Sequence, residues 1–253
     1  MRVATWNVNS LNARLELLQE FLETRHPDVV ALQETKIEDE NFPEKFFKGM
    51  GYNCAFKGEK SYNGVAVLSR LEFDAVEKNF DWIENGQKRL IMVVVKGIKI
   101  MNAYFPHGKM IGSSYYKFKL DFIKKLGEYL KNYVSNALII TGDFNVAMER
   151  KDVYAPDIMQ YSIGFSDAER KALKELYNTG FVDLFRMFNE EGKQYTWWDY
   201  RANSFKRNAG MRLDYIWATK KLAEKCRSCY IDKEMRSKPK PSDHAPVIAD
   251  FEI

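Results

Sequence analysis

The stretch that most constrains the fold reads Ala137-Leu-Ile-Ile-Thr-Gly-Asp-Phe-Asn145. Its first part, Ala137–Thr141, is a short apolar run that predicts a buried β-strand. The run ends in polar residues, with Asp143 and Asn145 two positions apart. Side chains at this spacing share one face of an extended chain, so they present two oxygens side by side. Sites are assembled at strand ends in layered α/β folds, so the segment predicts both a strand and a site.

Similar apolar runs recur on either side of this stretch. They predict strands over Arg2–Val8, Val29–Leu32, Gly64–Leu68, Leu90–Val95, Ile98–Phe105, Arg212–Ala218 and Ala245–Phe251. Helical spacing predicts a helix between Leu11 and Pro27, another over Lys117–Tyr133, and a third that Ser166 caps with Glu169 in a capping box. This order predicts an α/β fold in which two packed mixed sheets are covered by helices. No linker or repeat interrupts the chain, so we expect a single domain over residues 1–253.

The composition is that of a globular protein, with 45% hydrophobic and 29% charged residues among 253. No apolar run approaches the ~20 residues of a membrane-spanning helix, and the N-terminus lacks the apolar core of a signal peptide. The three cysteines exclude a disulfide framework. These features predict a cytoplasmic protein with no membrane partner. The net charge of +4 permits a polyanionic partner without requiring one.

Polar and ionisable residues stand where several of the predicted strands end. They are Asn7, Asn9, Glu34, Tyr104, Asp143, Asn145, Asp214, Asp243 and His244. Taken singly, most of these residues would be turn formers, caps or solvated loop residues. Taken together, carboxylates and amides that converge on one place repel one another unless a cation joins them. Oxygen ligands favour Mg²⁺ or Mn²⁺, and a hard cation beside one histidine is suited to phosphoryl transfer to water.

Nine short motifs follow one another along the chain. They are Thr5-Trp6-Asn7-Val8-Asn9, Leu32-Gln33-Glu34-Thr35-Lys36, Asn63-Gly64-Val65-Ala66, Asn102-Ala103-Tyr104-Phe105-Pro106, Gly142-Asp143-Phe144-Asn145, Gly180-Phe181-Val182-Asp183, Tyr195-Thr196-Trp197-Trp198, Arg212-Leu213-Asp214-Tyr215 and Ser242-Asp243-His244-Ala245-Pro246. In this order they resemble the exonuclease III family of apurinic/apyrimidinic (AP) endonucleases. The resemblance runs from Arg2 to Phe251 and implies a four-layer, DNase I-like α/β sandwich of the endonuclease/exonuclease/phosphatase superfamily.

The resemblance also implies an activity and its partners. The expected reaction is Mg²⁺-dependent cleavage of DNA on the 5′ side of an abasic site, which leaves a 3′-hydroxyl, and Mn²⁺ is expected to substitute. Activity as a 3′–5′ exonuclease and 3′-phosphodiesterase is expected as well. The implied partner is double-stranded DNA with abasic sites or blocked 3′ ends, and the implied enzyme is a monomer.

The family's catalytic roles carry over to matching residues. Glu34 with Asn7 would hold the cation, and Asp243 would lie beside it. Asp143 would activate or orient the attacking water, and Asn145 would fix that water or a phosphate oxygen. The wider candidate ligand set is Asn7, Glu34, Asp143, Asn145, Asp243 and His244.

Two further roles complete the implied catalytic set. His244, oriented by Asp214, would donate to a non-bridging phosphate oxygen, and Tyr104 would stabilise the charge that develops there. Either Asp143 or His244 could take the proton from water, and either one or two cations could take part.

Basic and aromatic residues alternate near the C-terminal third of the chain, where they suit DNA phosphates and an extruded nucleotide. The candidate phosphate contacts are Arg201, Lys206, Arg207 and Arg212. The resemblance places Trp197, Met211 and Leu213 around a pocket for the flipped abasic sugar, with Met211 where many relatives carry Trp. Trp198 and Asn9 are further candidates for DNA contact. A solvated basic loop is the alternative interpretation of this segment.

The cysteine pair Cys226 and Cys229 does not predict a metal site. No second cysteine pair accompanies it, and at this spacing the two thiols would fall on opposite faces of a strand.

Two other functions compete with a DNA-repair nuclease. A Mg²⁺-dependent phosphoesterase acting on lipid headgroups or small phosphoesters would share the same catalytic core. A non-catalytic nucleic-acid-binding regulator would have lost acidic residues from that core, yet Glu34, Asp143, Asp214 and Asp243 are all present.

Overall fold

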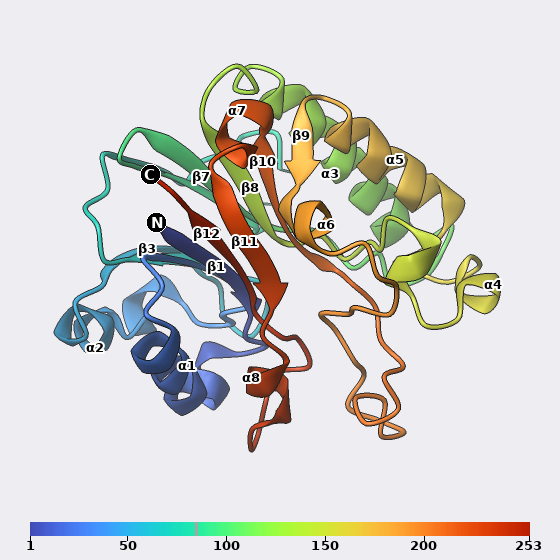
Figure 1. The fold of residues 1–253 in the computed structure, drawn as a ribbon, viewed down its shortest axis with the longest axis horizontal. Coiled ribbons are helices and arrows are strands. Elements are labelled where there is room, and N and C mark those ends of the chain that lie inside the picture. Colours follow the sequence, from blue (N-terminus) through green and yellow to red (C-terminus); the bar gives the residue numbers. More distant parts are fainter. Residues whose placement is uncertain (84–85) are drawn as a thin grey trace.

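The computed structural model describes residues 1–83 and 86–253, and its architecture is a sandwich of two six-stranded sheets (Figure 1). The first sheet has the strand order β11-β12-β1-β2-β4-β3. Its strands are β1 (Arg2–Asn7), β2 (Val29–Gln33), β3 (Asn53–Lys57), β4 (Val65–Ser69), β11 (Cys226–Ile231) and β12 (Val247–Phe251). The second sheet has the order β5-β6-β7-β8-β10-β9. Its strands are β5 (Ala75–Glu77), β6 (Leu90–Val95), β7 (Ile98–Tyr104), β8 (Leu138–Asp143), β9 (Phe181–Asp183) and β10 (Asp214–Thr219).

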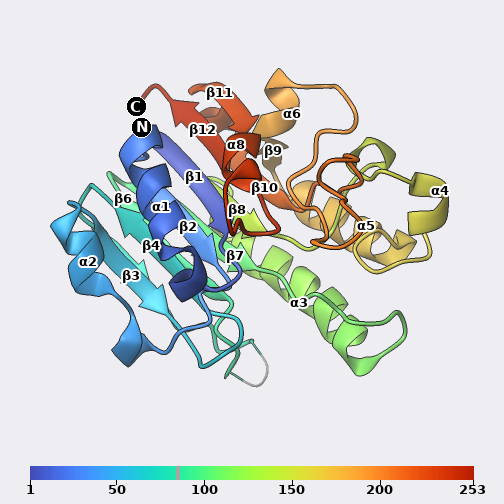
Figure 2. The same ribbon diagram turned by 90° about the horizontal axis from the view of Figure 1, so that it is seen from below.

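Helices cover the outer faces of the sandwich (Figures 1 and 2). They are α1 (Leu11–Arg25), α2 (Glu44–Gly49), α3 (Ser114–Leu130), α4 (Pro156–Met159), α5 (Asp167–Tyr177), α6 (Leu184–Phe188), α7 (Lys220–Ala223) and α8 (Lys233–Ser237), with short 3₁₀ turns at Asp39–Asn41 and Arg150–Asp152. Helices α1 and α2 lie on the first sheet, whereas α3 and α5 lie on the second. The predicted two-sheet α/β class is therefore confirmed.

Alternation along each strand builds the layers. In β1, Val3 belongs to the core between the sheets, and Ala4 belongs to the core under α1. In β8, Ile139 faces the first sheet and Ile140 faces α3. Both faces of these strands are buried, which explains why they read as continuous apolar runs in the sequence.

The strands predicted from apolar runs are all present, with ends within two residues of those expected. The capping box of Ser166 and Glu169 is confirmed at the start of α5. The helix predicted over Lys117–Tyr133 is present as α3, but its bounds were wrong, since α3 begins and ends three residues earlier. Ser113 caps it by accepting a hydrogen bond from the Tyr116 amide. Strands β3, β5 and β9 were not predicted, because they are short or partly exposed and lack a continuous apolar run.

Two expectations about side-chain faces are wrong. Asn145, which was expected to share a face with Asp143, lies just beyond β8 in a left-handed conformation with φ of 52°, so strand alternation does not set the direction of its side chain. Cys226 and Cys229 both enter the core between the sheets, because the pairing of β11 with β12 shifts register between Cys226 and Ser228. The bulge turns two thiols expected on opposite faces toward one side.

In the described parts of the chain, no helix is long and apolar enough to cross a membrane.

Gly142 lets three strands approach one another at the end of β8. It pairs with Ala103 in β7 and with Tyr215 in β10, and its φ is 136°. A Cβ atom at this position would lie 2.0 Å from the Ala103 carbonyl oxygen. Only glycine fits this approach, which places Asp143 beside both neighbouring strands.

We expect Gly142→Ala to lower the free energy of unfolding by about 3 kcal/mol, because backbone atoms would have to move apart. Urea unfolding monitored by circular dichroism measures the change. Gly49→Ala in α2 is the matched control: nothing lies within 4 Å of an added Cβ there, and stability should rise slightly. Equal effects of the two substitutions would contradict the role given to Gly142.

Candidate active site

Strand register brings the polar strand ends together at one end of the sandwich. Asp214, the first residue of β10, pairs directly with Asp143, the last residue of β8. Tyr104 at the end of β7 pairs with Asp143 from the other side. In the first sheet, Asn7 pairs with Gln33 at the ends of β1 and β2, which places Glu34 next to Asn7.

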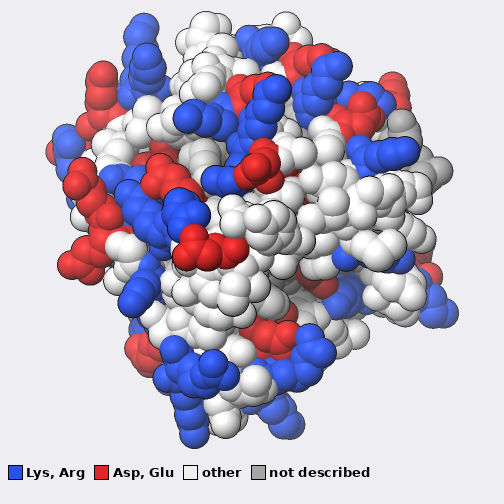
Figure 3. All heavy atoms as spheres, turned by 90° about the vertical axis from the view of Figure 1, so that its right-hand side faces the viewer, with Lys and Arg blue, Asp and Glu red and all other residues white. Residues whose placement is uncertain are grey.

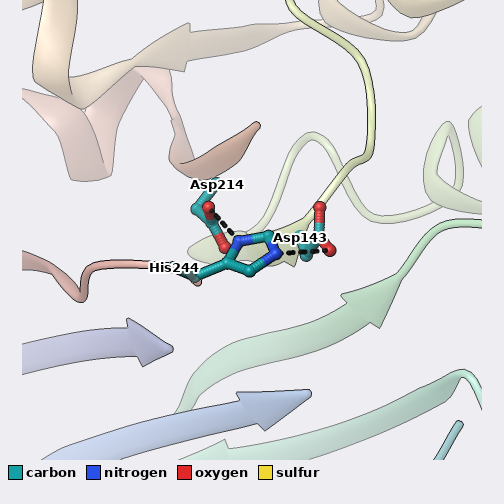
Figure 4. A group of neighbouring side chains, drawn as sticks. All are labelled: Asp143, Asp214 and His244. Atoms are coloured by element: carbon teal, nitrogen blue, oxygen red, sulfur yellow. Dashed lines mark hydrogen bonds and ion pairs between the residues drawn. The ribbon is translucent and has the colours of Figure 1, made fainter. Parts of the chain in front are cut away.

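His244 lies between two buried carboxylates (Figure 4). Its Nδ1 is 2.8 Å from Asp214 Oδ2, and its Nε2 is 3.8 Å from Asp143 Oδ2. The backbone of His244 is held as well, because its amide donates to Ser242 Oγ and its carbonyl accepts from the Trp6 indole. The ring therefore has one fixed orientation, with Nε2 directed toward Asp143.

The pKa values of His244 and Asp143 are both raised, but for different reasons. Burial would lower the pKa of His244, but Asp214 and Asp143 outweigh it and raise the pKa to about 10. For Asp143, burial raises the pKa to about 7, although His244 partly opposes the shift. At neutral pH the histidine is thus protonated, and the Asp143 carboxyl is poised to exchange a proton.

Glu34 is joined to Asp143 by one amide. Asn7 Nδ2 donates to Glu34 Oε1 and to Asp143 Oδ2, at 2.9 Å in each case. Lys36 Nζ lies 2.8 Å from Glu34 Oε2. Burial would raise the pKa of Glu34, but Lys36 and Asn7 together lower it. Glu34 has φ of 51°, a left-handed conformation that directs its side chain toward Asn7 and records local strain at the site.

Asn145 reaches Asp143 from the loop after β8. Its backbone amide donates to Asp143 Oδ1 at 2.8 Å, and its side-chain amide donates to Asp143 Oδ2 at 3.2 Å and to the Phe105 carbonyl at 3.0 Å. Both Asp143 oxygens therefore accept hydrogen bonds from protein, which fixes the plane of the carboxylate.

Tyr104 is buried, and burial together with Glu34 raises its pKa well above the ordinary value. The phenol therefore stays protonated and can serve only as a hydrogen-bond donor to an anion. The Arg89 guanidinium lies over its ring at 4.8 Å. Neither Arg89 nor Lys36 was identified as a site residue from the sequence. A basic residue next to the Glu34 motif was the one available signal for Lys36.

The donor set fits a divalent cation. Carboxylate oxygens of Asp143 and Asp214 lie within 4.8 Å of one another in buried surroundings. Asp214 Oδ1 is buried and has no hydrogen-bond partner among the described residues. Glu34 adds a third acidic group, which Asn7 links to Asp143. So many negative charges in a low-dielectric site favour a cation, and oxygen donors favour a hard one.

The comparisons with known proteins agree with this geometry. The sequence profile described as Endonuclease/Exonuclease/phosphatase family matches residues 4–244. The chain belongs to this family. Exodeoxyribonuclease III of Haemophilus influenzae is 34% identical over 266 residues, an alignment that covers 99% of this chain and 100% of the relative.

Two solved structures support the same family over their full lengths. An AP endonuclease from Archaeoglobus fulgidus has a TM-score of 0.97 and 38% identity, with 100% of both chains covered. A 3′-5′ exonuclease (NExo) from Neisseria meningitidis has a TM-score of 0.97 and 36% identity, also with 100% of both chains covered. The predicted exonuclease III resemblance and the nuclease class of hydrolase are confirmed. The family is metal-dependent, in keeping with the buried acidic and histidine cluster.

Asp243, the residue before His244, is held by hydrogen bonds from two other segments of the chain. Its Oδ1 accepts a hydrogen bond from Asn9 Nδ2 at 2.9 Å, and its Oδ2 accepts one from the Trp197 indole at 3.0 Å. Asn9 also accepts a hydrogen bond from Lys36 at 2.6 Å. Asp243 thus links the Asn9 loop to Trp197, and both of its oxygens are engaged by protein donors.

An apolar cluster borders the site next to His244. Met211 and Leu213 are buried there with Ala147, Val153 and Phe165, and the half-buried Trp197 packs against them. Isolated β-bridges connect Trp197 to Met211 and to His244. The structure therefore brings together the three residues that were predicted to form one pocket wall.

Two of the predicted DNA contacts are placed differently. Arg212 is 1% exposed, and its guanidinium forms ion pairs with Asp152 and Asp183 at 2.8 and 2.7 Å. It cannot reach DNA phosphates, so its assignment as a phosphate contact is wrong. Trp198 is fully buried, with its indole donating to Asn208, and it packs beneath the surface instead of contacting DNA.

The other basic candidates lie at the surface. Arg201, Lys206 and Arg207 are exposed in the loop between α6 and β10, with Arg201 paired to Asp199. Figure 3 shows the face on the right of Figure 1, where Lys and Arg side chains are interspersed with acidic ones around an uncharged area. A mixed surface of this kind can hold phosphates at a few points without forming one continuous basic patch.

We expect Asp214→Asn to lower the pKa of His244 from about 10 toward its ordinary range, because a neutral amide no longer favours the imidazolium. An NMR pH titration of the His244 ring protons in metal-free protein measures it. Asp243→Asn is the matched control, since Asp243 acts on His244 only at longer range and its loss should lower the pKa less. Equal shifts would remove Asp214 as the orienting partner.

Arg212→Met should reduce the free energy of unfolding by about 3–5 kcal/mol, because Asp152 and Asp183 would remain buried without their counter-charge. Urea unfolding measures this loss. Arg201→Met, which changes an exposed arginine, is the control and should leave stability nearly unchanged. If Arg212 contacted phosphates instead, its variant would keep its stability and bind DNA with a flatter salt dependence.

Proposed function

We propose that this chain is a Mg²⁺-dependent DNA-repair nuclease that hydrolyses the phosphodiester on the 5′ side of an abasic site. We further propose that it works as a single domain over residues 1–253, as a monomer, and that it also removes blocked 3′ ends as a 3′–5′ exonuclease and 3′-phosphodiesterase. The observation that carries the proposal is the placement of His244 between Asp214 and Asp143, with Glu34 tied to Asp143 through Asn7.

The two shifted pKa values support a division of labour. A carboxyl group with a pKa of about 7, such as Asp143, can take the proton of the attacking water at neutral pH. His244, with a pKa of about 10, stays protonated and can donate from Nε2 to a non-bridging phosphate oxygen. Asn145 would hold the water or a phosphate oxygen beside Asp143. Tyr104 would donate to the oxygen on which negative charge develops.

The product follows from the atoms that move. Water adds to phosphorus, its proton passes to Asp143, and the bond from phosphorus to the 3′ oxygen breaks. The leaving oxygen becomes a 3′-hydroxyl after protonation, and the phosphate stays on the 5′ oxygen of the abasic residue.

Glu34 is our principal candidate for holding the metal, with Asp143 and Asn7 beside it. A bound Mg²⁺, for which Mn²⁺ should substitute, would stabilise negative charge on the phosphate oxygens and on the leaving oxygen. Lys36 forms an ion pair with Glu34 Oε2. The other carboxylate oxygen, Oε1, accepts a hydrogen bond from Asn7 and lies on the side of Asp143.

We assign the recognition of abasic sites to the apolar residues Trp197, Met211 and Leu213 beside His244. A base-free nucleotide leaves the helix at low cost and needs only a small cavity, such as one bounded by Trp197, Met211 and Leu213. The exposed Arg201, Lys206 and Arg207 would hold phosphates without reading sequence. Trp198, which packs with Tyr195 and Ala245, would act only indirectly by holding the segment that carries Trp197.

The proposal is tested with a labelled DNA duplex that carries one abasic analogue. The purified chain should nick it on the 5′ side in Mg²⁺ or Mn²⁺ and leave a 3′-hydroxyl that a polymerase extends. Chelation should abolish nicking, and Mg²⁺ should restore it. Glu34→Ala should lower kcat by about 10²-fold or more while DNA binding persists, because charge stabilisation in the transition state is lost.

Glu16→Ala, which removes an acidic residue of α1 away from the site, is the control for the loss of a carboxylate. A matched reaction with inositol phosphates and p-nitrophenyl phosphate tests the alternative phosphoesterase. Preference for those substrates, full activity in chelator, or a 3′ unsaturated aldehyde product would each overturn the proposed function.

A further inference from the structure

One lysine lies buried directly behind the site. Lys119 in α3 is fully buried, and its ammonium group has three acceptors. It forms an ion pair with Glu169 and donates to the backbone carbonyls of Asn145, at 2.8 Å, and His107, at 3.1 Å. All three protons are therefore used, and two of them hold the loops that follow β8 and β7.

Glu169 completes the connection on the other side. Both of its oxygens accept from the Gly164 amide at 3.0 Å, and Oε2 also accepts from the amide and hydroxyl of Ser166. The Gly164 carbonyl in turn accepts from the Ala147 amide at 2.7 Å. The ion pair thus closes the segment 145–164 at both of its ends and joins α3 to α5.

Asn145 is the residue on which this arrangement acts. Its φ of 52° is a left-handed conformation, which asparagine adopts more readily than most residues, and here the carbonyl of that conformation is held by Lys119. Its carbonyl points back to Lys119, whereas its side chain points forward to Asp143 and the Phe105 carbonyl. Fixing the carbonyl therefore fixes the direction in which the side-chain amide is presented.

A role in stability alone does not explain why Lys119 donates to the carbonyls of Asn145 and His107. A buried ion pair contributes little to stability compared with well-packed apolar residues. Two apolar side chains could join α3 to α5 equally well, yet they could not bind the carbonyls of Asn145 and His107. The two carbonyl groups that accept from Lys119 belong to the loops that follow β7 and β8, the strands that end in Tyr104 and Asp143.

We propose that Lys119, held by Glu169, is a positioning residue that acts on the reaction through Asn145. This inference rests on the proposed nuclease function. Lys119 touches neither the substrate nor the reacting atoms. Its removal lets the backbone of Asn145 relax, so that the side-chain amide no longer meets the water or phosphate oxygen beside Asp143.

The test compares Lys119→Met, Asn145→Ala and the double variant on the abasic duplex in saturating Mg²⁺. A displacement of about 1 Å can lower a rate by about 10²-fold. We therefore expect Lys119→Met to lower kcat by roughly 10- to 100-fold with KM changed by less than about threefold. In the Asn145→Ala background the same substitution should cost less than about threefold, because the residue it acts through is already gone.

Leu173→Ala is the matched control for lost stability. Leu173 is buried in α5, four residues after Glu169, and packs in the apolar core over the second sheet. It should lower the melting temperature at least as much as Lys119→Met and leave kcat nearly unchanged. If Lys119→Met does not fold, Glu169→Gln repeats the comparison, since it keeps the side chain's shape and removes the charge that holds the ammonium.

The outcomes separate the two proposals. A wild-type chain that does not nick the duplex would end the proposed function. A wild-type chain that nicks it would leave the role of Lys119 to be decided by the variants. Unchanged kcat in a folded Lys119→Met protein, or losses in log kcat that add in the double variant, would overturn the positioning role.

Discussion

Strand β8 pairs with β7 on one side and with β10 on the other, and the site depends on this double pairing. The register puts Tyr104, Asp143 and Asp214 in one row across three strands. Gly142 allows the strands to approach because a side chain there would collide with the Ala103 carbonyl. The first sheet then supplies Glu34 and Asn7 across the interface between the sheets. Catalytic geometry is therefore a consequence of backbone pairing, and the loops refine it.

The strands of the core could be predicted because both of their faces are buried. Apolar runs such as Ile139–Ile140 in β8 report burial directly, and the polar residue that follows marks the strand end. The order of Glu34, Asp143, Asp214 and His244 along the chain predicted a group of residues that the fold does bring together. The left-handed conformation of Glu34 could not be predicted, because glutamate rarely adopts it and it depends here on the tertiary contacts of the site.

Buried charges escaped prediction for a related reason. The spacing of apolar residues predicts that charged residues such as Arg212 and Lys119 lie at the surface. Both are instead buried, with carboxylate partners that are distant in the sequence. Arg212 joins Asp152 to Asp183 behind the apolar wall, and Lys119 joins Glu169 to the carbonyl of Asn145. Their partners come from other elements, so only the fold reveals them. The bulge that turns Cys226 and Cys229 to one side is likewise a property of pairing between β11 and β12.

Burial of the Arg212 and Lys119 side chains away from the site leaves the acidic residues of the site without their positive charge. Asp143 and Asp214 flank His244, and Glu34, which Asn7 links to Asp143, is paired with Lys36. Arginine and lysine side chains that could have neutralised the site, such as Arg212 and Lys119, are committed to Asp152, Asp183 and Glu169. A phosphodiester brings further negative charge, which the buried carboxylates would repel at close range. A metal cation between the carboxylates would make the interaction with the phosphodiester attractive, in keeping with the metal dependence of the family.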